Sequence, residues 1–291
     1  MFESKEEALI PERQDVPEEY FVDEDNLNIL VVGADTAEGD GGRSDSLIFT
    51  SFDLNTKKIF MLSVPRDSRV DIPGRKNKDR INAAYSYGGI ELCKETVTDL
   101  LKVPIDYYVQ TDFAGFESII DALGGIEIDV DKRMNYHTYD GQINIQKGLQ
   151  TLNGKDALGY VRFRHDPMGD ITRTERQQKF LKAVAKKMLD PNSLLKLPSL
   201  IPSLHEAVKS DMSVKQMVAL ATMFQGMDVD NDIVTMTLPG TPKTINGVSY
   251  WLVDPDEAAQ LVKDKQNELS QPEVVEPEGE GQPDETTAEQ K

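Results

Sequence analysis

Arginine side chains are concentrated in one part of this chain. All of them except Arg13 lie between residues 43 and 176, and the densest stretch, with acidic residues interspersed, runs from Arg162 to Gln177. Lysines continue to the end of the chain, so the pattern is not a general basic bias. A guanidinium is planar, permanently charged and able to form two parallel hydrogen bonds, which suits it to phosphate oxygens. The mixture of arginine and aspartate therefore predicts a site for a phosphate ester together with a metal ion.

Two aspartates near predicted strand ends are the candidates for holding that metal. Asp35 follows the apolar run 27–33, and Asp45 precedes the apolar run 46–52. Carboxylate oxygens without histidine or cysteine suit a hard cation, Mg²⁺ or Mn²⁺, better than Zn²⁺. The alternative is that both aspartates are turn residues or partners of surface arginines.

Three predicted strands would bring the scattered residues together. The apolar runs 27–33, 46–52 and 58–64 are typical of buried strands, and the linker 53–57 is short enough for a hairpin. In an antiparallel meander, the end of the first strand, the start of the second and the end of the third share one end of the sheet. The residues expected to converge there are Asp35, Arg43, Asp45 and Arg66.

The arginine-rich stretch supplies the other half of the predicted site. Arg162 and Arg164 are two residues apart on a segment predicted to be a strand, so they would project from one face. Arg173 and Gln177 are four apart on a predicted helix and would share a face near its N-terminus, where the dipole favours an anion. The alternatives are strand-edge charges for the first pair and a capped, ion-paired helix start around Asp170 for the second.

Helix and strand patterns alternate along the rest of the chain. The predicted helices cover residues 89–102, 112–123, 172–189, 213–225 and 255–269. The further predicted strands cover residues 105–110, 126–130, 233–238 and 248–253, with a polar hairpin at 134–147. This mixture predicts a single α/β domain with a central mixed, largely antiparallel-edged β-sheet covered by helices on both faces.

Charge separates the predicted domain from two acidic ends. Of the net charge of −19, −8 falls in residues 1–25 and −6 in residues 271–291, so the part between carries −5. Such ends cannot bury enough apolar surface to fold. We therefore predict an acidic leader over 1–26, a domain over 27–270 and a disordered tail over 271–291. The balanced middle shows no basic face for nucleic acid, which is excluded as a partner.

Cysteine content and hydropathy limit the remaining classes of protein. Cys93 is the single cysteine, so an intrachain disulfide and a cysteine-based metal site are excluded. Its place in a helical apolar pattern predicts a packing residue rather than a nucleophile. No run approaches the roughly 20 apolar residues that span a bilayer, and the N-terminal residues do not have the pattern of a signal peptide. The chain is therefore predicted to be soluble, or to be the soluble part of a protein whose anchor was removed.

The site residues lie in segments that resemble the LytR-CpsA-Psr family of cell-wall glycopolymer ligases. Two of them are Arg43-Ser-Asp-Ser46 and Ser63-Val-Pro-Arg-Asp67. The segments occur in order between about residues 27 and 190, at 28–35, 43–46, 63–67, 80–85, 121–126, 152–157 and 160–177. The segment 243–250 is similar, less specifically, to the family's C-terminal part.

The resemblance implies a Mg²⁺-dependent phosphotransferase outside the cytoplasmic membrane of a Gram-positive bacterium. Such enzymes take a wall teichoic acid or capsular polysaccharide from an undecaprenyl-diphosphate carrier and attach it to peptidoglycan through a phosphodiester. The family usually carries a transmembrane helix before this domain, so the resemblance implies an anchor that this chain lacks. Two alternatives stay open: a pyrophosphatase for polyprenyl-diphosphate glycans, and a non-catalytic receptor for phospholipid or wall polymer.

The resemblance also implies a role for each site residue. Asp35 and Asp45 would hold Mg²⁺ against the diphosphate, and Asp170 would orient the network of arginines. The chemistry of the transfer adds a carboxylate, Asp45 or Asp170, that would accept a proton from the attacking hydroxyl. The prenyl chain would need an apolar groove, for which residues 113–123 and 180–204 are the candidates. The side chains that would bind the diphosphate are Arg43, Arg66, Arg80, Arg162, Arg164, Arg173 and Gln177. The residues expected to be catalytic are Arg43, Asp45, Arg66, Arg162, Arg164 and Asp170.

Overall fold

The computed structural model describes residues 25–35, 42–138, 141–163, 170–190 and 207–271. Most of the predicted acidic leader (1–24 of 1–26) and of the predicted tail (272–291 of 271–291) lies outside these residues, as does the apolar segment 180–204 beyond residue 190. None of the described helices is long and apolar enough to cross a membrane.

A six-stranded mixed sheet forms the centre of the molecule, in the order β11-β6-β1-β2-β3-β12. β1, β2 and β3 pair antiparallel, which confirms the predicted meander. β6 and β12 pair parallel to β1 and β3, and β11 pairs antiparallel to β6, so one edge is antiparallel and the other parallel. The strands are β1 (Asn26–Asp35), β2 (Arg43–Asp53), β3 (Ile59–Val64), β6 (Tyr107–Thr111), β11 (Lys209–Ser210) and β12 (Ile233–Thr237).

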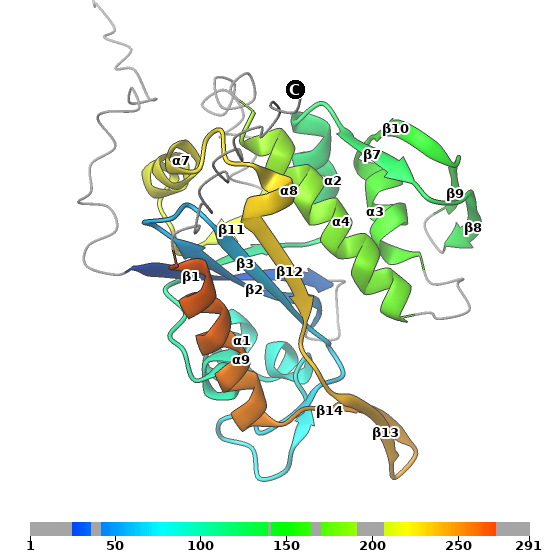
Figure 1. Ribbon diagram of the computed structural model, residues 1–291. Helices are drawn as coiled ribbons and strands as arrows, with labels where there is room; N and C mark the ends of the chain where they lie inside the picture. The colour runs from blue at the N-terminus through cyan, green and yellow to red at the C-terminus, as the bar shows by residue number, and fades with distance from the viewer. Residues whose placement is uncertain (1–24, 36–41, 139–140, 164–169, 191–206, 272–291) are drawn as a thin grey trace, which may run out of the picture.

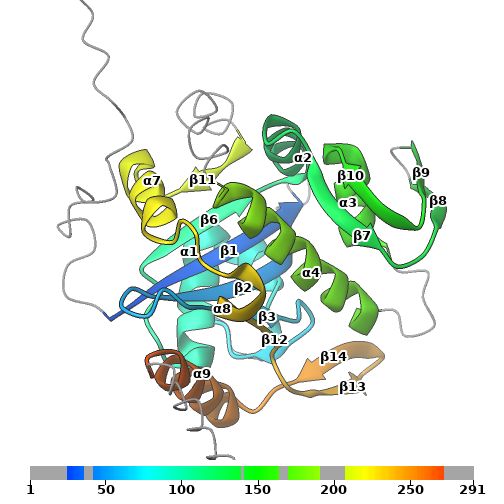
Figure 2. The same cartoon turned by 45° about the horizontal axis from the view of Figure 1, so that its top comes forward.

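Helices cover both faces of this sheet, as predicted (Figures 1 and 2). Strand β1 shows the reason, because its successive apolar side chains point to opposite faces. Leu30 and Val32 join the core beneath two helices, whereas Leu27 and Ile29 join the core on the other side. The first face is covered by α1 (Ala83–Leu101) and α9 (Pro255–Leu269), and the second by α4 (Asp170–Met188) and α7 (Val214–Met223).

A second layer stands beside the sheet with a core of its own. Ile120, Ile128, Tyr160 and Phe180 are buried in this core. Because Phe180 lies on α4, which also packs on the central sheet, this helix joins the two cores. The layer contains α2 (Phe113–Ala122), α3 (Gly154–Arg162), the ribbon β7 (Ile126–Val130) with β10 (Gly148–Leu152), and the hairpin β8 (Met134–Thr138) with β9 (Gly141–Ile145).

Two small ribbons extend the fold beyond the end of β3. One pairs β4 (Arg69–Val70) with β5 (Asp79–Arg80), and the other pairs β13 (Thr241–Ile245) with β14 (Val248–Leu252). They meet where Ser68 bridges Trp251 and the Trp251 amide donates to the Asp67 carbonyl at 2.9 Å. The remaining described element is the short helix α8 (Val229–Asp232).

Helix α1 differs from the helix predicted at 89–102. It begins at Ala83, and its backbone is non-helical at Gly88 and Gly89. The glycine pair interrupts the apolar periodicity, which concealed the first two turns. Cys93 on this helix is buried, and burial raises the pKa of its thiol to about 12. Its burial among the apolar side chains of this core confirms the prediction of a packing residue.

The segment that carries Arg162 is helical, so the prediction of a strand there was wrong. α3 begins after Asn153, whose side chain accepts a hydrogen bond from the Asp156 amide at 2.9 Å. An asparagine N-cap followed three residues later by an acid is a helix-start signal that the strand prediction overlooked. Arg162 therefore ends a helix, and Arg164 lies outside the described residues.

Candidate functional site

A cavity of about 510 Å³ lies between α4 and the end of the sheet where β1 ends and β2 begins. Charged and polar side chains line one part of it: Asp45, Arg66, Arg162, Arg173 and Gln177. Apolar side chains line another, among them Val31, Ile48, Phe113, Phe116, Leu158, Val161, Phe180 and Leu181. The meander, α2, α3 and α4 thus bring five of the predicted site residues to one cavity.

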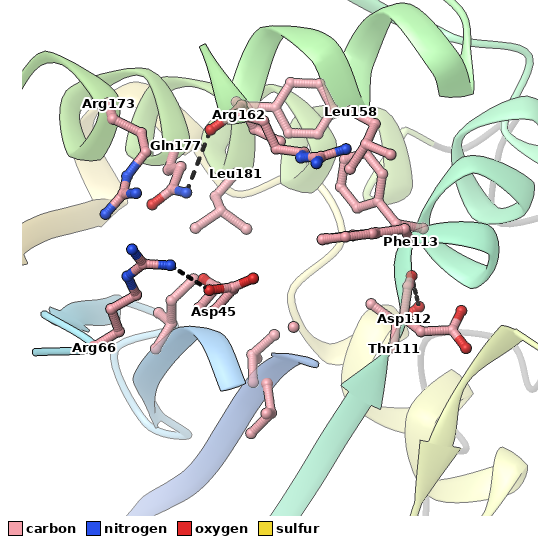
Figure 3. Close-up of a pocket in the computed structure, with 18 of the residues that line it drawn as sticks. Asp45, Arg66, Thr111, Asp112, Phe113, Leu158, Arg162, Arg173, Gln177 and Leu181 are labelled. Carbon is pink, nitrogen blue, oxygen red and sulfur yellow. Dashed lines mark hydrogen bonds and ion pairs between the residues drawn. The ribbon is translucent and has the colours of Figure 1, made fainter. Parts of the chain in front are cut away.

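Asp45 and Arg66 form an ion pair at the sheet end of this cavity. Arg66 Nη1 lies 2.5 Å from Asp45 Oδ1, and the two side chains keep 27% and 34% of their surface exposed. The carboxylate fixes one side of the guanidinium while the rest of it faces the cavity (Figure 3). Arg66 is therefore held in place with donors left toward a ligand.

A β-bulge determines where the Asp45 side chain points. Gly33 is opposite Ser46 and Ala34 is opposite Ser44, so Asp45 is an extra residue in β2. In a regular strand, Asp45 and Ser46 would project to opposite faces. With the bulge, both line the cavity. The irregular register is thus what brings the carboxylate to the site.

Arg173 and Gln177 approach from the opposite wall. Both lie on α4, and Figure 3 shows them pointing from this helix toward Arg66 and Asp45. The predicted spacing of four residues on one helix face is confirmed. Gln177 Nε2 also donates to the Val161 carbonyl at 3.4 Å, which ties α4 to the last turn of α3.

Arg162 is held against an aromatic wall. Its guanidinium carbon lies 4.5 Å from the centroid of the Phe113 ring (Figure 3). That ring starts α2, where the Asp112 side chain caps the helix by accepting from the Gly115 amide at 2.8 Å. Stacking on an aromatic face stabilises a guanidinium and fixes its plane. The charge is therefore presented at the boundary between the polar and apolar parts of the cavity.

Arg176 is a buried arginine to which the sequence patterns gave no role. Its side chain donates from Nη2 to the Phe163 carbonyl at 2.7 Å, and the guanidinium lies 5.2 Å from the Phe163 ring centroid. Burial lowers the pKa of Arg176, and the negative charge of Asp131 opposes this shift. By binding the residue that follows Arg162, Arg176 supports the C-terminal end of α3. Its spacing of four from the apolar Phe180 was the available signal.

Several predicted site residues are not brought into the cavity. Arg43 is exposed and does not line it, although its backbone is opposite Asp35. Arg80 also lies elsewhere: it donates to the Ser249 carbonyl at 2.9 and 3.1 Å and pairs with Asp67 at 3.3 Å. The side chains of Asp35 and Asp170, and the whole of Arg164, lie outside the described residues. Tyr136 and His137 of β8 line the cavity without any sequence signal for a role.

The acidic positions at this end of the sheet fit a divalent cation shared with a phosphate ligand. Asp35 is the last residue of β1 and is paired with Arg43, the first residue of β2. Asp45, two residues after Arg43, lines the cavity. Within the described residues, no group of three or more His, Cys, Asp or Glu side chains could form a complete metal cage. A pair of carboxylates suits Mg²⁺, which commonly keeps waters and takes substrate phosphates as further ligands.

The charges of the described lining favour an anion. Three arginines, Arg66, Arg162 and Arg173, line the cavity against two acidic residues, Asp45 and Asp112, so its described lining carries a small surplus of positive charge. An elongated ligand with a phosphorylated end and an apolar tail fits both parts at once.

Comparisons with known proteins identify the family to which this chain belongs. A model described as the LytR_cpsA_psr family matches residues 3–267. The "Polyisoprenyl-teichoic acid--peptidoglycan teichoic acid transferase TagU" of Oceanobacillus iheyensis is 35% identical over 255 residues, 85% of this chain and 77% of that protein. The crystal structure of Bacillus subtilis TagV has a TM-score of 0.76 at 33% identity, covering 85% of this chain and 98% of that one. A structure described as TagT bound to LI-WTA has a TM-score of 0.69 at 28% identity, covering 86% and 95%. This chain belongs to the LytR_cpsA_psr family.

Proposed function

We propose that this chain is a glycopolymer–peptidoglycan transferase that takes a teichoic-acid-type polymer from a polyprenyl diphosphate and joins it to peptidoglycan through a phosphodiester. Relatives named as teichoic acid transferases support the reaction class. The TagT structure described as bound to LI-WTA supports a wall-polymer ligand for this fold. The chemistry also implies a location outside the cytoplasmic membrane, where peptidoglycan lies, with attachment through an anchor.

The observation that carries the proposal is the division of the cavity into two parts. Phe113, Phe116 and Phe180 offer apolar contacts for a prenyl chain. Arg66 and Arg173 face each other beyond them and fit the two phosphates (Figure 3). A water-soluble phosphate ester would gain nothing from the apolar part, and an uncharged lipid would gain nothing from Arg66 and Arg173.

The proposed reaction is a phosphoryl transfer in which positioning and charge matter more than covalent help from the protein. A hydroxyl oxygen of the acceptor glycan attacks the phosphorus that carries the polymer. The bond from this phosphorus to the bridging oxygen breaks, and prenyl monophosphate leaves with the electron pair. The acceptor proton passes to a carboxylate, with Asp45 or Asp170 as the candidates, and then to water.

The arginines would lower the barrier by stabilising charge that grows on the phosphates. Arg66 is fixed by Asp45, and Arg162 is fixed by the Phe113 ring, so little reorganisation is needed when the charge develops. Arg173 approaches the same space from α4. Mg²⁺, held by Asp35 and Asp45, would supply further neutralisation of the diphosphate when bound.

A reconstituted reaction tests the proposal. The protein is incubated with a polyprenyl-diphosphate glycan, a peptidoglycan oligomer and Mg²⁺, and the products are identified by mass spectrometry. We expect a phosphodiester-linked conjugate and free prenyl monophosphate. If glycan phosphate forms without any conjugate, the protein is a hydrolase and not a transferase. If the lipid is bound but unchanged, the protein is a receptor.

The metal requirement has a separate test. Chelation with EDTA should abolish conjugate formation, and added Mg²⁺ or Mn²⁺ should restore it. Calorimetric titration of the unliganded protein with Mg²⁺, alone and with inorganic diphosphate, provides a readout besides activity. If the diphosphate binds equally with and without Mg²⁺, the shared metal site is wrong.

A further inference from the structure

A basic surface lies directly beyond the proposed phosphate site. Residues 69–80, here called the basic ribbon, carry a net charge of +3, whereas residues 26–270 as a whole carry −5. The ribbon is β4, β5 and the loop between them, and residues 74–78 at its tip are all exposed. It begins three residues after Arg66, so Arg69 lies within about 11 Å of Arg66 between Cα atoms.

The ribbon places like charges beside each other at a cost. Arg69 is opposite Arg80 in the β4–β5 pair, and like charges directly opposite destabilise such a pair. Both guanidiniums lie over the same Tyr250 ring, at 5.7 and 5.8 Å from its centroid. The β13–β14 hairpin thus supports an arrangement of charge that the ribbon alone would resist.

A second arginine–tyrosine pair extends this surface. The guanidinium of Arg75 lies 4.0 Å from the centroid of the Tyr87 ring, and Tyr87 is 43% exposed. The Tyr87 hydroxyl donates to Asp79 at 2.7 Å, which fixes the ring at the base of the ribbon. Arg75 is therefore a positioned cation, with exposed Lys76 beside it.

The acidic side chains nearby are already engaged. Asp67 pairs with Arg80 at 3.3 Å, Asp71 pairs with Lys78 at 3.1 Å, and Asp79 accepts from Tyr87 and the Arg80 amide. The surface therefore favours a ligand that carries repeated negative charge. A peptide stem with both ammonium and carboxylate groups has less to gain here.

We propose that the basic ribbon binds the phosphodiester repeats of the donor polymer, downstream of the diphosphate held in the cavity. This inference rests on the proposed function, because it assumes that the polymer emerges at Arg66. The inference also assigns a role to Arg80. Arg80 pairs with Asp67, the residue after Arg66, and so belongs to the basic ribbon and not to the diphosphate pocket. The ribbon then distinguishes long, phosphate-rich donors from short ones.

A binding experiment tests the surface without any transfer. Lipid-free poly(glycerol phosphate) of increasing length is titrated into the full chain at low and high salt. We expect affinity to rise with length and to fall with salt. The variant Arg75→Glu/Lys76→Glu should bind the long polymer about fivefold more weakly or worse. The matched control is Lys209→Glu/Lys215→Glu, which makes the same change of charge at exposed positions on β11 and α7.

Two outcomes would overturn the ribbon proposal: affinity that does not depend on length, or an equal loss in the control variant. Far-ultraviolet circular dichroism and the unfolding temperature establish that each variant is folded. Because no lipid or acceptor is present, these results stand even if the chain proves not to be a transferase.

A kinetic experiment then links the surface to the reaction. The ratio of KM for a long donor to KM for a one-repeat donor is measured at fixed acceptor. We expect this ratio to be below one for the wild-type chain and the control, and to approach one for Arg75→Glu/Lys76→Glu. A variant that instead raises KM for the acceptor would assign the ribbon to peptidoglycan and refute the donor assignment. Absence of transfer in the wild-type chain would refute the proposed function alone.

Discussion

At the residue scale, the site depends on side chains that hold one another in place. Asp45 fixes Arg66, Phe113 carries Arg162, and Gln177 reaches the last turn of α3. Because these contacts are partly exposed, they contribute little to the free energy of folding. They contribute more to the binding of a charged ligand and its transition state. Stability and transfer should therefore respond differently to substitution.

Asp45→Asn provides the first test of that separation. The change removes a partly exposed ion pair, so the free energy of unfolding should fall by only about 1 kcal/mol. Loss of the fixed charge should reduce transfer on the order of 10²-fold. Urea unfolding and the conjugate assay measure the two effects. Glu268→Gln breaks the exposed Lys265–Glu268 pair and should leave transfer unchanged. Equal transfer by both variants would remove Asp45 from the site.

Arg176→Met tests the buried arginine behind the cavity. It removes the hydrogen bond to the Phe163 carbonyl, so we expect a loss of about 1.5–3 kcal/mol in the free energy of unfolding. Because Phe163 follows Arg162, transfer should fall as well. We compare the loss of transfer, expressed as a change in activation free energy, in two double variants. Arg176→Met with Arg162→Ala should lose less than the sum of the two single losses, whereas Arg176→Met with Arg66→Ala should lose the full sum. Additivity in both cycles would contradict a link between Arg176 and Arg162.

At the element scale, close contact between α2 and α3 forms one wall of the cavity. A Cβ on Gly154 would lie 2.3 Å from the Glu117 carbonyl oxygen, so α3 can approach α2 only because this position is glycine. Phe113 and Leu158, which line the cavity, are carried by these two helices. The packing of the helices therefore sets the width of the apolar part.

Gly154→Ala should separate these helices. Overpacking at a backbone contact typically costs about 1–3 kcal/mol, and we expect a loss of that size. The neighbouring Lys155→Ala serves as the control, because Lys155 is exposed. Thermal unfolding and the affinity for a prenyl diphosphate are the measurements. Unfolding temperatures that agree between the two variants would show that the helices have room for the methyl group.

At the scale of the whole molecule, the end of the described chain is tied back to its first strands. Ser270 donates to the Asp53 carboxylate at 2.5 Å, and Gln266 donates to Asn28 and Ser51 at 3.0 and 2.8 Å. Burial raises the pKa of Asp53, but hydrogen bonds from Ser270, Thr56 and Asn55 outweigh it. The pKa therefore lies below the ordinary 3.8.

This pKa gives stability a defined dependence on pH. Because the pKa is lower in the folded state, the carboxylate of Asp53 stabilises the fold above about pH 3.8, and this contribution disappears as the pH falls through the folded pKa. Asp53→Asn should therefore make the decline of unfolding temperature below pH 3.8 shallower than in the wild-type chain. Ser270→Ala should shift the decline toward higher pH. Ser118→Ala, whose hydroxyl donates to Ala114 within its own helix, is the control. Parallel pH curves for Asp53→Asn and the wild-type chain would refute this role.

Local pattern alone determined much of the architecture. The apolar runs predicted the β1–β2–β3 meander, because a buried strand can be recognised from its own apolar residues and from the short turn that follows it. The helix face shared by Arg173 and Gln177 followed from their spacing, and helix α9 was predicted with the bounds that the structure has. The site residues on these elements could be found for the same reason.

Only the tertiary structure decided how those residues meet. The bulge that turns Asp45 into the cavity depends on the register between two strands, which no spacing within one strand records. The burial of Arg176 and the displacement of Arg80 to the basic ribbon depend on contacts with segments far along the chain. Sequence thus determined the arginine-rich chemistry and the elements that carry it, because both are local properties. The fold decided which charges share one cavity, because that depends on long-range packing.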